Sequence, residues 1–251
     1  MNHLEVSTLG AVKTVTMRRP EKRNAIDASM MEGLRETFSQ EPEAGERVAV
    51  IRGEGHVFCA GLQLRTSGVE HDEAARIEAM FDAVQRYPLP VVAVVQGPAI
   101  AGGCELALHC DFVVAAEDAP FAMPLAQLGV ATTWFLSKKL MEAAGPVTTR
   151  EFLLLGEPLT GTRLHELGVV SRVAPKEALE EEALALVDRL ASNAPLAMRA
   201  MKSQIIRHND FMMAIDHRDL DPEIEAVYQS ADAKEGVAAR LEKRVPKFYG
   251  R

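Results

Sequence analysis

A glutamate and two glycines stand together where a buried strand is expected to turn into a helix. Residues 91–95 read Val-Val-Ala-Val-Val, Gly102 and Gly103 follow a tight loop, and Glu105 falls in the first helical turn. The first N–H groups of a helix lack intrahelical partners, and the helix dipole adds partial positive charge there. Glycine also lets another molecule approach the backbone. The junction therefore predicts fixed donors for a developing oxyanion, with an acid or base beside them.

A second strand end offers a matching backbone donor. The segment 56–61, His-Val-Phe-Cys-Ala-Gly, ends on small residues, so the N–H of Ala60 is available to pair with that of Gly102. Two donors at adjacent strand ends form an oxyanion hole. The plainer alternative is that the glycines only make a turn and that Glu105 only complements the helix dipole.

Composition narrows the classes of protein to consider. The 251 residues are 47% hydrophobic, enough for one large core, and the formal net charge of −8 argues against partners such as nucleic acid or an anionic membrane. The three cysteines show no metal-ligand spacing, and an odd count fits a reducing compartment. The N-terminus lacks a leader pattern, and no run of 18 apolar residues occurs. We expect a cytoplasmic protein without a metal site or a membrane segment.

The elements that must position these residues alternate between strand and helix up to about residue 176. This order predicts an α/β core, whereas the remainder shows helical periodicity alone. The strands expected are a hairpin over 4–17 and segments at 48–51, 91–95, 112–115 and 169–173. The helices expected are 28–40, 72–87, one from Trp134 closed by Gly145, 147–155, 161–167, 177–192, 195–208, 212–230 and 234–243.

Several motifs occur in an order that resembles one known family. They are the segment 56–61, the segment 90–111 with Gly-Gly-Cys-Glu-Leu-Ala at 102–107, Asn24-Ala25, Asn193-Ala194-Pro195, and the ending from Glu235-Gly236 to Arg251. Together they resemble the crotonase superfamily of enoyl-CoA hydratases and isomerases. The resemblance spans essentially the whole chain.

The resemblance implies a crotonase-like spiral of ββα units over residues 1–193 and a helical oligomerisation region over 194–251, giving a homotrimer or a hexamer of paired trimers. It implies an acyl-CoA thioester substrate, with coenzyme A as part of that substrate and no other cofactor. The thioester oxygen would be held by the amides of Ala60 and Gly102, with Glu105 catalytic. Substrate and CoA contacts are implied for Lys22, Arg23, Ala25, Ala60, Gly61, Leu62, Gln63, Gly102, Leu125, Thr132, Trp134 and Lys247.

The chain also departs from the family pattern. Typical hydratases carry a second glutamate, and Leu125 occupies its place here. A leucine cannot transfer a proton or hold a water molecule. The usual aspartate after Ala-Gly-x is Gln63, and three glycines of the following loop become Thr133, Phe135 and Leu136. We therefore expect a bulkier and drier pocket lip.

Three hypotheses follow. The first is an enzyme that isomerises or hydrates an enoyl-CoA with Glu105 as the single general acid/base. Hydration would need Glu105 alone, or Thr132, Thr133 or His109, to position water, although we expect His109 to be a packed or exposed helix residue. The second is an acyl-CoA decarboxylase or thioesterase using the same oxyanion hole. The third, motivated by Leu125, is a catalytically silent acyl-CoA-binding protein.

Overall fold

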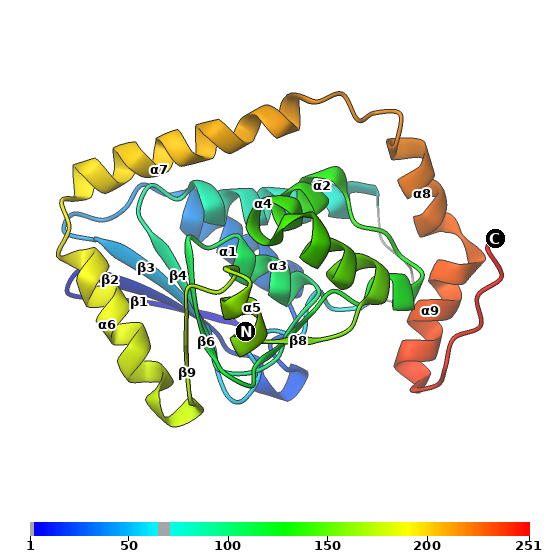
Figure 1. Ribbon diagram of the computed structural model, residues 1–251, viewed down its shortest axis with the longest axis horizontal. Helices are drawn as coiled ribbons and strands as arrows, with labels where there is room; N and C mark the ends of the chain where they lie inside the picture. Colours follow the sequence, from blue (N-terminus) through cyan, green and yellow to red (C-terminus); the bar gives the residue numbers. More distant parts are fainter. Residues whose placement is uncertain (1–2, 65–70) are drawn as a thin grey trace.

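The computed structural model describes residues 3–64 and 71–251, and its strands form two sheets (Figure 1). In the larger sheet only the β1–β2 pair is antiparallel; all other neighbours are parallel. Its order is β1 (Leu4–Leu9), β2 (Val12–Met17), β3 (Val48–Gly53), β4 (Val91–Val95), β6 (Phe112–Ala116) and β9 (Arg172–Ala174). The smaller sheet holds β5 (Ala99–Ile100), β7 (Pro120–Ala122) and β8 (Leu159–Thr160).

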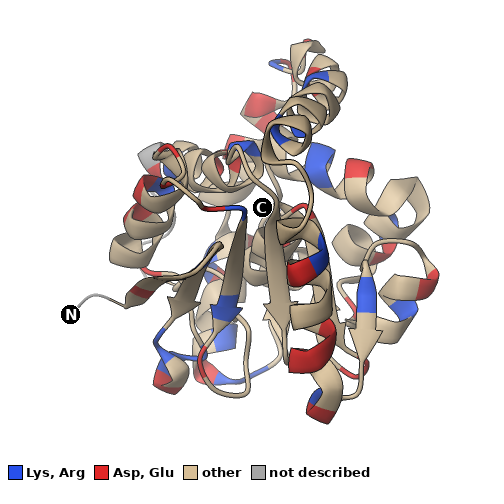
Figure 2. Cartoon of the chain, turned by 90° about the vertical axis from the view of Figure 1, so that its left-hand side faces the viewer, with Lys and Arg blue, Asp and Glu red and all other residues tan. Residues whose placement is uncertain are grey.

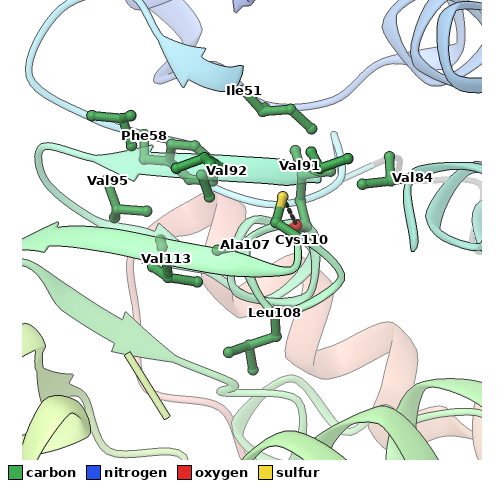
Figure 3. Packing of buried hydrophobic residues seen from close by; sticks show 14 of the residues in the cluster. Ile51, Phe58, Val84, Val91, Val92, Val95, Ala107, Leu108, Cys110 and Val113 are labelled. Carbon is green, nitrogen blue, oxygen red and sulfur yellow. Dashed lines mark hydrogen bonds between the residues drawn. The ribbon is translucent and has the colours of Figure 1, made fainter. Parts of the chain in front are cut away.

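The centre of the larger sheet is apolar on both faces. Every residue of β4 is buried between β3 and β6, and Ile51, Phe58 and Val113 pack around Val91, Val92 and Val95 (Figure 3). Continuous β-branched strands of this kind are typical of parallel sheets covered on both faces. Figure 2 shows the charged residues mainly on helices and loops, with strands that are largely uncharged.

Helices cover the sheet where hydrophobic periodicity predicts them. They are α1 (Ala28–Ser39), α2 (His71–Arg86), α3 (Gly102–Leu108), α4 (Trp134–Arg150), α5 (Gly161–Glu166) and α6 (Leu179–Ala191). Short 3-10 turns lie at Pro20–Lys22 (η1), Ala126–Leu128 (η2), Lys176–Ala178 (η4) and Phe211–Ala214 (η5), and a π-helical turn (η3) at Glu151–Leu155. Gly145, with φ 68° and ψ 171°, breaks α4 in the place where the sequence indicated a helix end.

Two successive repeats send one strand to the larger sheet, one short strand to the smaller sheet, and then a helix, whereas the repeat before them reaches the smaller sheet through the isolated bridge between Cys59 and Ala99. Strands β4 and β5 lead into α3, and β6 and β7 lead into α4. This arrangement confirms the expected α/β spiral of ββα units. It also brings the ends of successive repeats to the same region.

The C-terminal region is helical and returns to its own core. It consists of α7 (Pro195–Asp210), α8 (Asp221–Gln229) and α9 (Ala231–Glu242), with α8 and α9 at the end of the molecule opposite α6 (Figure 1). The continuous helix expected over 212–230 is wrong: residues 215–220 are not helical, and the next helix begins at Asp221 with Pro222 in its first turn. Proline lacks an N–H and suits a helix start rather than its interior. The division at residue 193 and the role in trimer formation stay predictions.

The arm formed by α8 and α9 packs closely against residues 128–131 of the same chain. A Cβ on Gly236 would lie 2.1 Å from the Leu128 backbone oxygen. The Tyr228 hydroxyl donates a 2.6 Å hydrogen bond to the Ala131 carbonyl. Across the described ranges, the structure contains no helix whose length and apolarity would let it cross a membrane.

Candidate active site

Three consecutive repeats deliver their ends to one cavity. Cys59 bridges Ala99, and Ile100 pairs with Ala122, so the segments that follow these positions lie next to one another. Leu62, Gly102 and Leu125 come from these three segments, and all three line a cavity of about 480 Å³. The repeat architecture therefore creates the site.

The first backbone donor expected from the sequence is wrong. The N–H of Ala60 donates a 3.0 Å hydrogen bond to the Arg23 carbonyl, so it is already occupied by its own chain. The N–H of Leu62, two residues later, makes no hydrogen bond within the described residues, because its bridge to Ile26 uses Gly61 and Gln63 instead. The free strand-end amide belongs to Leu62. Gly61 has a positive φ of 93°, which redirects the chain between Ala60 and Leu62. The glycine at this position is the sequence signal that the motif did not translate into a change of donor.

The helix start at Gly102 is where the sequence indicated it. Gly102 begins α3, and within the described residues its N–H has no acceptor. A Cβ on Gly102 would lie 3.3 Å from the Leu62 nitrogen, and a Cβ on Gly61 would lie 3.2 Å from the Gly102 nitrogen. The glycines therefore let two strand ends approach backbone to backbone, and their free amides lie together at the cavity.

The residue before this helix is strained. Ala101 has φ 49° and ψ −116°, a conformation that residues with a Cβ rarely adopt. Its N–H donates to the Ala122 carbonyl at 2.7 Å, which holds the turn in place. Strain of this kind costs on the order of 1–3 kcal/mol and is concentrated at functional sites. Here it sets the direction of the Gly102 amide.

The Glu105 side chain is buried and unpaired. Glu105 is 1% exposed, and within the described residues neither carboxyl oxygen has a hydrogen-bond partner. Burial raises the pKa of Glu105 to about 8, and the positive charge of Lys139 opposes this shift. At neutral pH the side chain is mainly a neutral acid. It lines the same cavity as the two free amides and is able to give or take a proton there.

The cavity walls are mostly apolar. Phe81, Met123, Leu125 and Leu136 line it together with side chains from the C-terminal arm. Leu125 occupies the lining, and the carboxylates among the described lining residues are Glu105 of α3 and Glu73 of α2. Arg244, whose basic side chain suits contact with the CoA phosphates, lines the cavity, and the C-terminal residues that motif reading missed are Tyr228, Gly236, Val237, Arg240, Pro246 and Phe248. No local pattern marks them, because their position depends on how the arm folds back.

The remaining candidate residues divide into two groups. Gln63 and Thr132 line the cavity, and Gln63 also accepts a 3.0 Å hydrogen bond from Arg19. Six candidates lie outside the lining, namely Lys22, Arg23, Ala25, Gly61, Trp134 and Lys247.

Trp134 is the aromatic residue among these six. Its ring stacks on His217, with centroids 4.9 Å apart, because Thr133 caps α4 and turns the first helical residue toward the segment before α8. Lys22 and Arg23 are exposed. The carbonyl of Arg23 accepts the hydrogen bond from the N–H of Ala60, so both residues lie close to that strand end. Lys247 is exposed between Pro246 and Phe248, which border the cavity.

Comparison with known proteins agrees with the motifs. The family model described as enoyl-CoA hydratase/isomerase matches residues 8–251. The chain is 32% identical to a 2,3-dehydroadipyl-CoA hydratase of Escherichia coli, with all of both chains covered, and 33% identical to a probable enoyl-CoA hydratase of Mycobacterium leprae over 95% of this chain and 96% of that protein.

Solved structures show the same likeness. A methylmalonyl-CoA decarboxylase in complex with 2-nitronate-propionyl-CoA is similar with a TM-score of 0.88 and 26% identity, over 99% of each chain. An enoyl-CoA hydratase from Mycobacterium avium subsp. paratuberculosis is similar with a TM-score of 0.86 and 27% identity, over 98% of each chain. With strand-end amides, a buried glutamate and a family match along nearly its whole length, the chain belongs to the enoyl-CoA hydratase/isomerase family of the crotonase superfamily.

Proposed function

We propose that this protein processes an acyl-CoA thioester through an enolate whose oxygen is held by the amides of Leu62 and Gly102. The observation that carries the proposal is the pair of unoccupied N–H groups beside the buried Glu105. Preorganised donors of this kind need no rearrangement when negative charge develops on the thioester oxygen. Coenzyme A enters as part of the substrate, and the chemistry needs no further cofactor.

The reaction that suits one carboxyl is isomerisation of an enoyl-CoA. Ionised Glu105 removes a proton from one carbon of the acyl chain, the dienolate is held by the two amides, and the same carboxyl returns the proton to another carbon. Addition of water by a carboxylate pair is disfavoured, because Leu125 occupies the equivalent end of the third repeat. The largely apolar cavity fits an acyl chain better than a water cluster.

A second candidate is decarboxylation of a malonyl-type thioester. At neutral pH the Glu105 carboxyl is mainly protonated, because burial raises its pKa to about 8. A neutral acid does not repel a substrate carboxylate, and it is ready to protonate the enolate that loss of CO2 leaves. The structural similarity to methylmalonyl-CoA decarboxylase also favours this candidate.

The basic residues near the cavity mouth are proposed to contact the CoA nucleotide. Lys22, Arg23 and Lys247 are exposed and lie next to segments that border the cavity. A homotrimer or hexamer stays our expectation for the assembly.

The test is a panel of acyl-CoA thioesters assayed with the wild type and Glu105→Gln. Isomerisation predicts that the glutamine variant loses shifting of the double bond while binding of CoA compounds, measured by calorimetry, is nearly unchanged. Decarboxylation predicts that release of CO2 largely survives, because its carbon–carbon cleavage needs no base. Absence of turnover for every thioester, with binding intact, would contradict the enzymatic proposal and leave a binding protein.

A further inference from the structure

His109 is a buried titratable residue that the proposed reaction does not use. It follows Glu105 by one turn of α3 and is 1% exposed. Its ring is stacked between Phe81 and Phe135, with centroids 4.8 and 5.4 Å away and interplanar angles of 19° and 17°. This clamp fixes the plane in which the ring nitrogens point.

A hydrogen bond assigns the proton on the ring. The Nδ1 atom lies 2.7 Å from the Glu105 backbone oxygen, which only accepts hydrogen bonds, so in the neutral ring the proton is on Nδ1. Burial lowers the pKa of His109 well below its usual range, and Lys139 and then Lys138 lower it further, against the bond to the Glu105 carbonyl, which raises it. The ring is therefore a neutral donor at Nδ1.

The same N–H lies beside the Glu105 carboxyl. Nδ1 is 3.6 Å from Glu105 Oε2, which is too long for a hydrogen bond, and the carboxyl is mainly protonated in this state. Once the carboxyl loses its proton, a buried negative charge needs a donor to compensate for lost solvation. A small rotation of the Glu105 side chain would bring Oε2 within hydrogen-bond distance of Nδ1.

A group of lysines stands on the other side of His109. The ring borders a second cavity of about 560 Å³, which Lys138 and Lys139 also line. The two Nζ atoms lie 3.4 and 3.2 Å from the two carboxyl oxygens of Glu142, so two cations share one carboxylate. The excess positive charge favours a negative charge on Glu105.

Other ionisable groups around this wall are paired or neutral, and Asp210 from α7 pairs with Arg86 from α2 at 2.8 Å. Lys202 from α7 pairs with Asp111 at 2.6 Å. Burial raises the pKa of the thiols of Cys104 and Cys110. Helix α2 presents the Phe81 ring to His109. The positive charge of Lys139 lowers the pKa of Glu105.

We infer that His109 and Lys139 stabilise the ionised form of Glu105 from behind the active site, His109 as a positioning residue through its Nδ1–H and Lys139 through its charge. The inference rests on the proposed role of Glu105 as the group that moves a proton. It explains how one carboxyl in an apolar cavity serves as both acid and base: the pair stabilises the charged form before the proton is taken and again after it is returned.

The test measures the titration of Glu105 directly, in the ligand-free full-length protein with 13C-labelled glutamate, using Glu105→Gln to assign the signal. His109→Leu removes the donor, and we expect the carboxyl pKa to rise by about one unit or more. His109→Asn places an amide N–H close to the Nδ1 position and should restore part of the shift. A rise that His109→Leu and His109→Asn share equally, or no rise in either, would overturn the role of His109.

A matched lysine pair tests the charge. Lys139→Met should raise the Glu105 pKa, whereas Lys138→Met, which removes a lysine bound to the same Glu142, should leave it nearly unchanged. Equal effects of the two substitutions would overturn the role of Lys139. The melting temperature of each variant confirms folding, and the lysine pair stays informative if His109→Leu does not fold.

Activity separates this inference from the proposed function. The acidity of Glu105 governs the pH profile of kcat/KM, so the profile should shift with the NMR titration in His109→Leu and Lys139→Met. If the titration shifts but no thioester is turned over, the proposed function fails while the electrostatic link stands. If turnover occurs and the titration does not shift, the link fails and the proposed function stands.

Discussion

The backbone nitrogen of Leu62 lies 3.3 Å from the point where a Cβ of residue 102 would stand. Only glycine at position 102 lets the two backbone segments lie this close without displacing each other. The same Cβ would lie 3.2 Å from Leu62 Cγ, so an alanine would push the Leu62 segment away by a few tenths of an ångström. The position of the two amides therefore depends on the glycine at residue 102.

Substitution of Gly102 by alanine should impair turnover more than folding. We expect kcat to fall by up to about 10²-fold, the scale for loss of one oxyanion donor, because the amides no longer converge. The melting temperature should change little. In contrast, Gly103→Ala would place a Cβ 2.2 Å from the Cys59 backbone oxygen and should lower the melting temperature strongly. Full activity of Gly102→Ala would argue against the paired amides.

The acidity of Glu105 predicts the direction of the pH profile. If Glu105 acts first as a base, kcat/KM should rise with pH and level off above about 8, where the carboxyl is ionised. If the reaction is decarboxylation, kcat/KM should fall as pH passes 8, because the ionised Glu105 carboxyl repels the carboxylate of the substrate. Steady-state kinetics from pH 6 to 10 with each substrate class distinguishes the two, and a flat profile would remove Glu105 from the proton transfer.

Ionisation of Glu105 also makes the free energy of unfolding depend on pH. The pKa of Glu105 is about 8 when folded, above the usual glutamate pKa of 4.5, so the stabilisation of the folded state is fully present below pH 4.5. It is lost as pH rises toward 8, at about 1.4 kcal/mol per pH unit. The Glu105→Gln variant has no carboxyl at this position, so its free energy of unfolding does not fall for this reason. In chemical denaturation, the free energy of unfolding of the variant relative to that of the wild type should therefore increase between pH 5 and 8 and then become constant.

Leu125→Glu should introduce addition of water to an enoyl-CoA. The new carboxyl would line the cavity that contains Glu105, and a second acid/base group contributes about 10²–10⁴-fold to proton transfer. Loss of enoyl absorbance measures the gain, and Leu125→Gln controls for the change in size and polarity. An equal gain in the glutamine variant would show that polarity alone admits the water.

Docking of the C-terminal arm should control substrate affinity. Gly236→Ala would place a Cβ 2.1 Å from the Leu128 oxygen, so α9 must move away from a wall of the cavity. We expect faster hydrogen exchange in α9 and a several-fold higher KM. Lys234→Ala, at an exposed position of the same helix, should leave both unchanged.

Patterns in the sequence predicted the elements better than the contacts between them. The β-branched run at 91–95 identified β4, and the glycine pair located the start of α3, because both depend on local composition. The donor was misplaced to Ala60 because its hydrogen bond to Arg23 joins segments 37 positions apart. The contacts of Trp134 with His217 and of Tyr228 with Ala131 likewise join distant segments, so they depend on where the C-terminal arm packs.

Each of the three repeats ends in this cavity, but they contribute different kinds of atoms. The first two supply main-chain N–H groups at Leu62 and Gly102, and the third supplies the side chain of Leu125. Under the proposed function, exchange of the residue at position 125 would redirect the chemistry while the two amides still hold the thioester. A scaffold arranged in this way can diversify by single substitutions, without rebuilding the part that recognises its substrate.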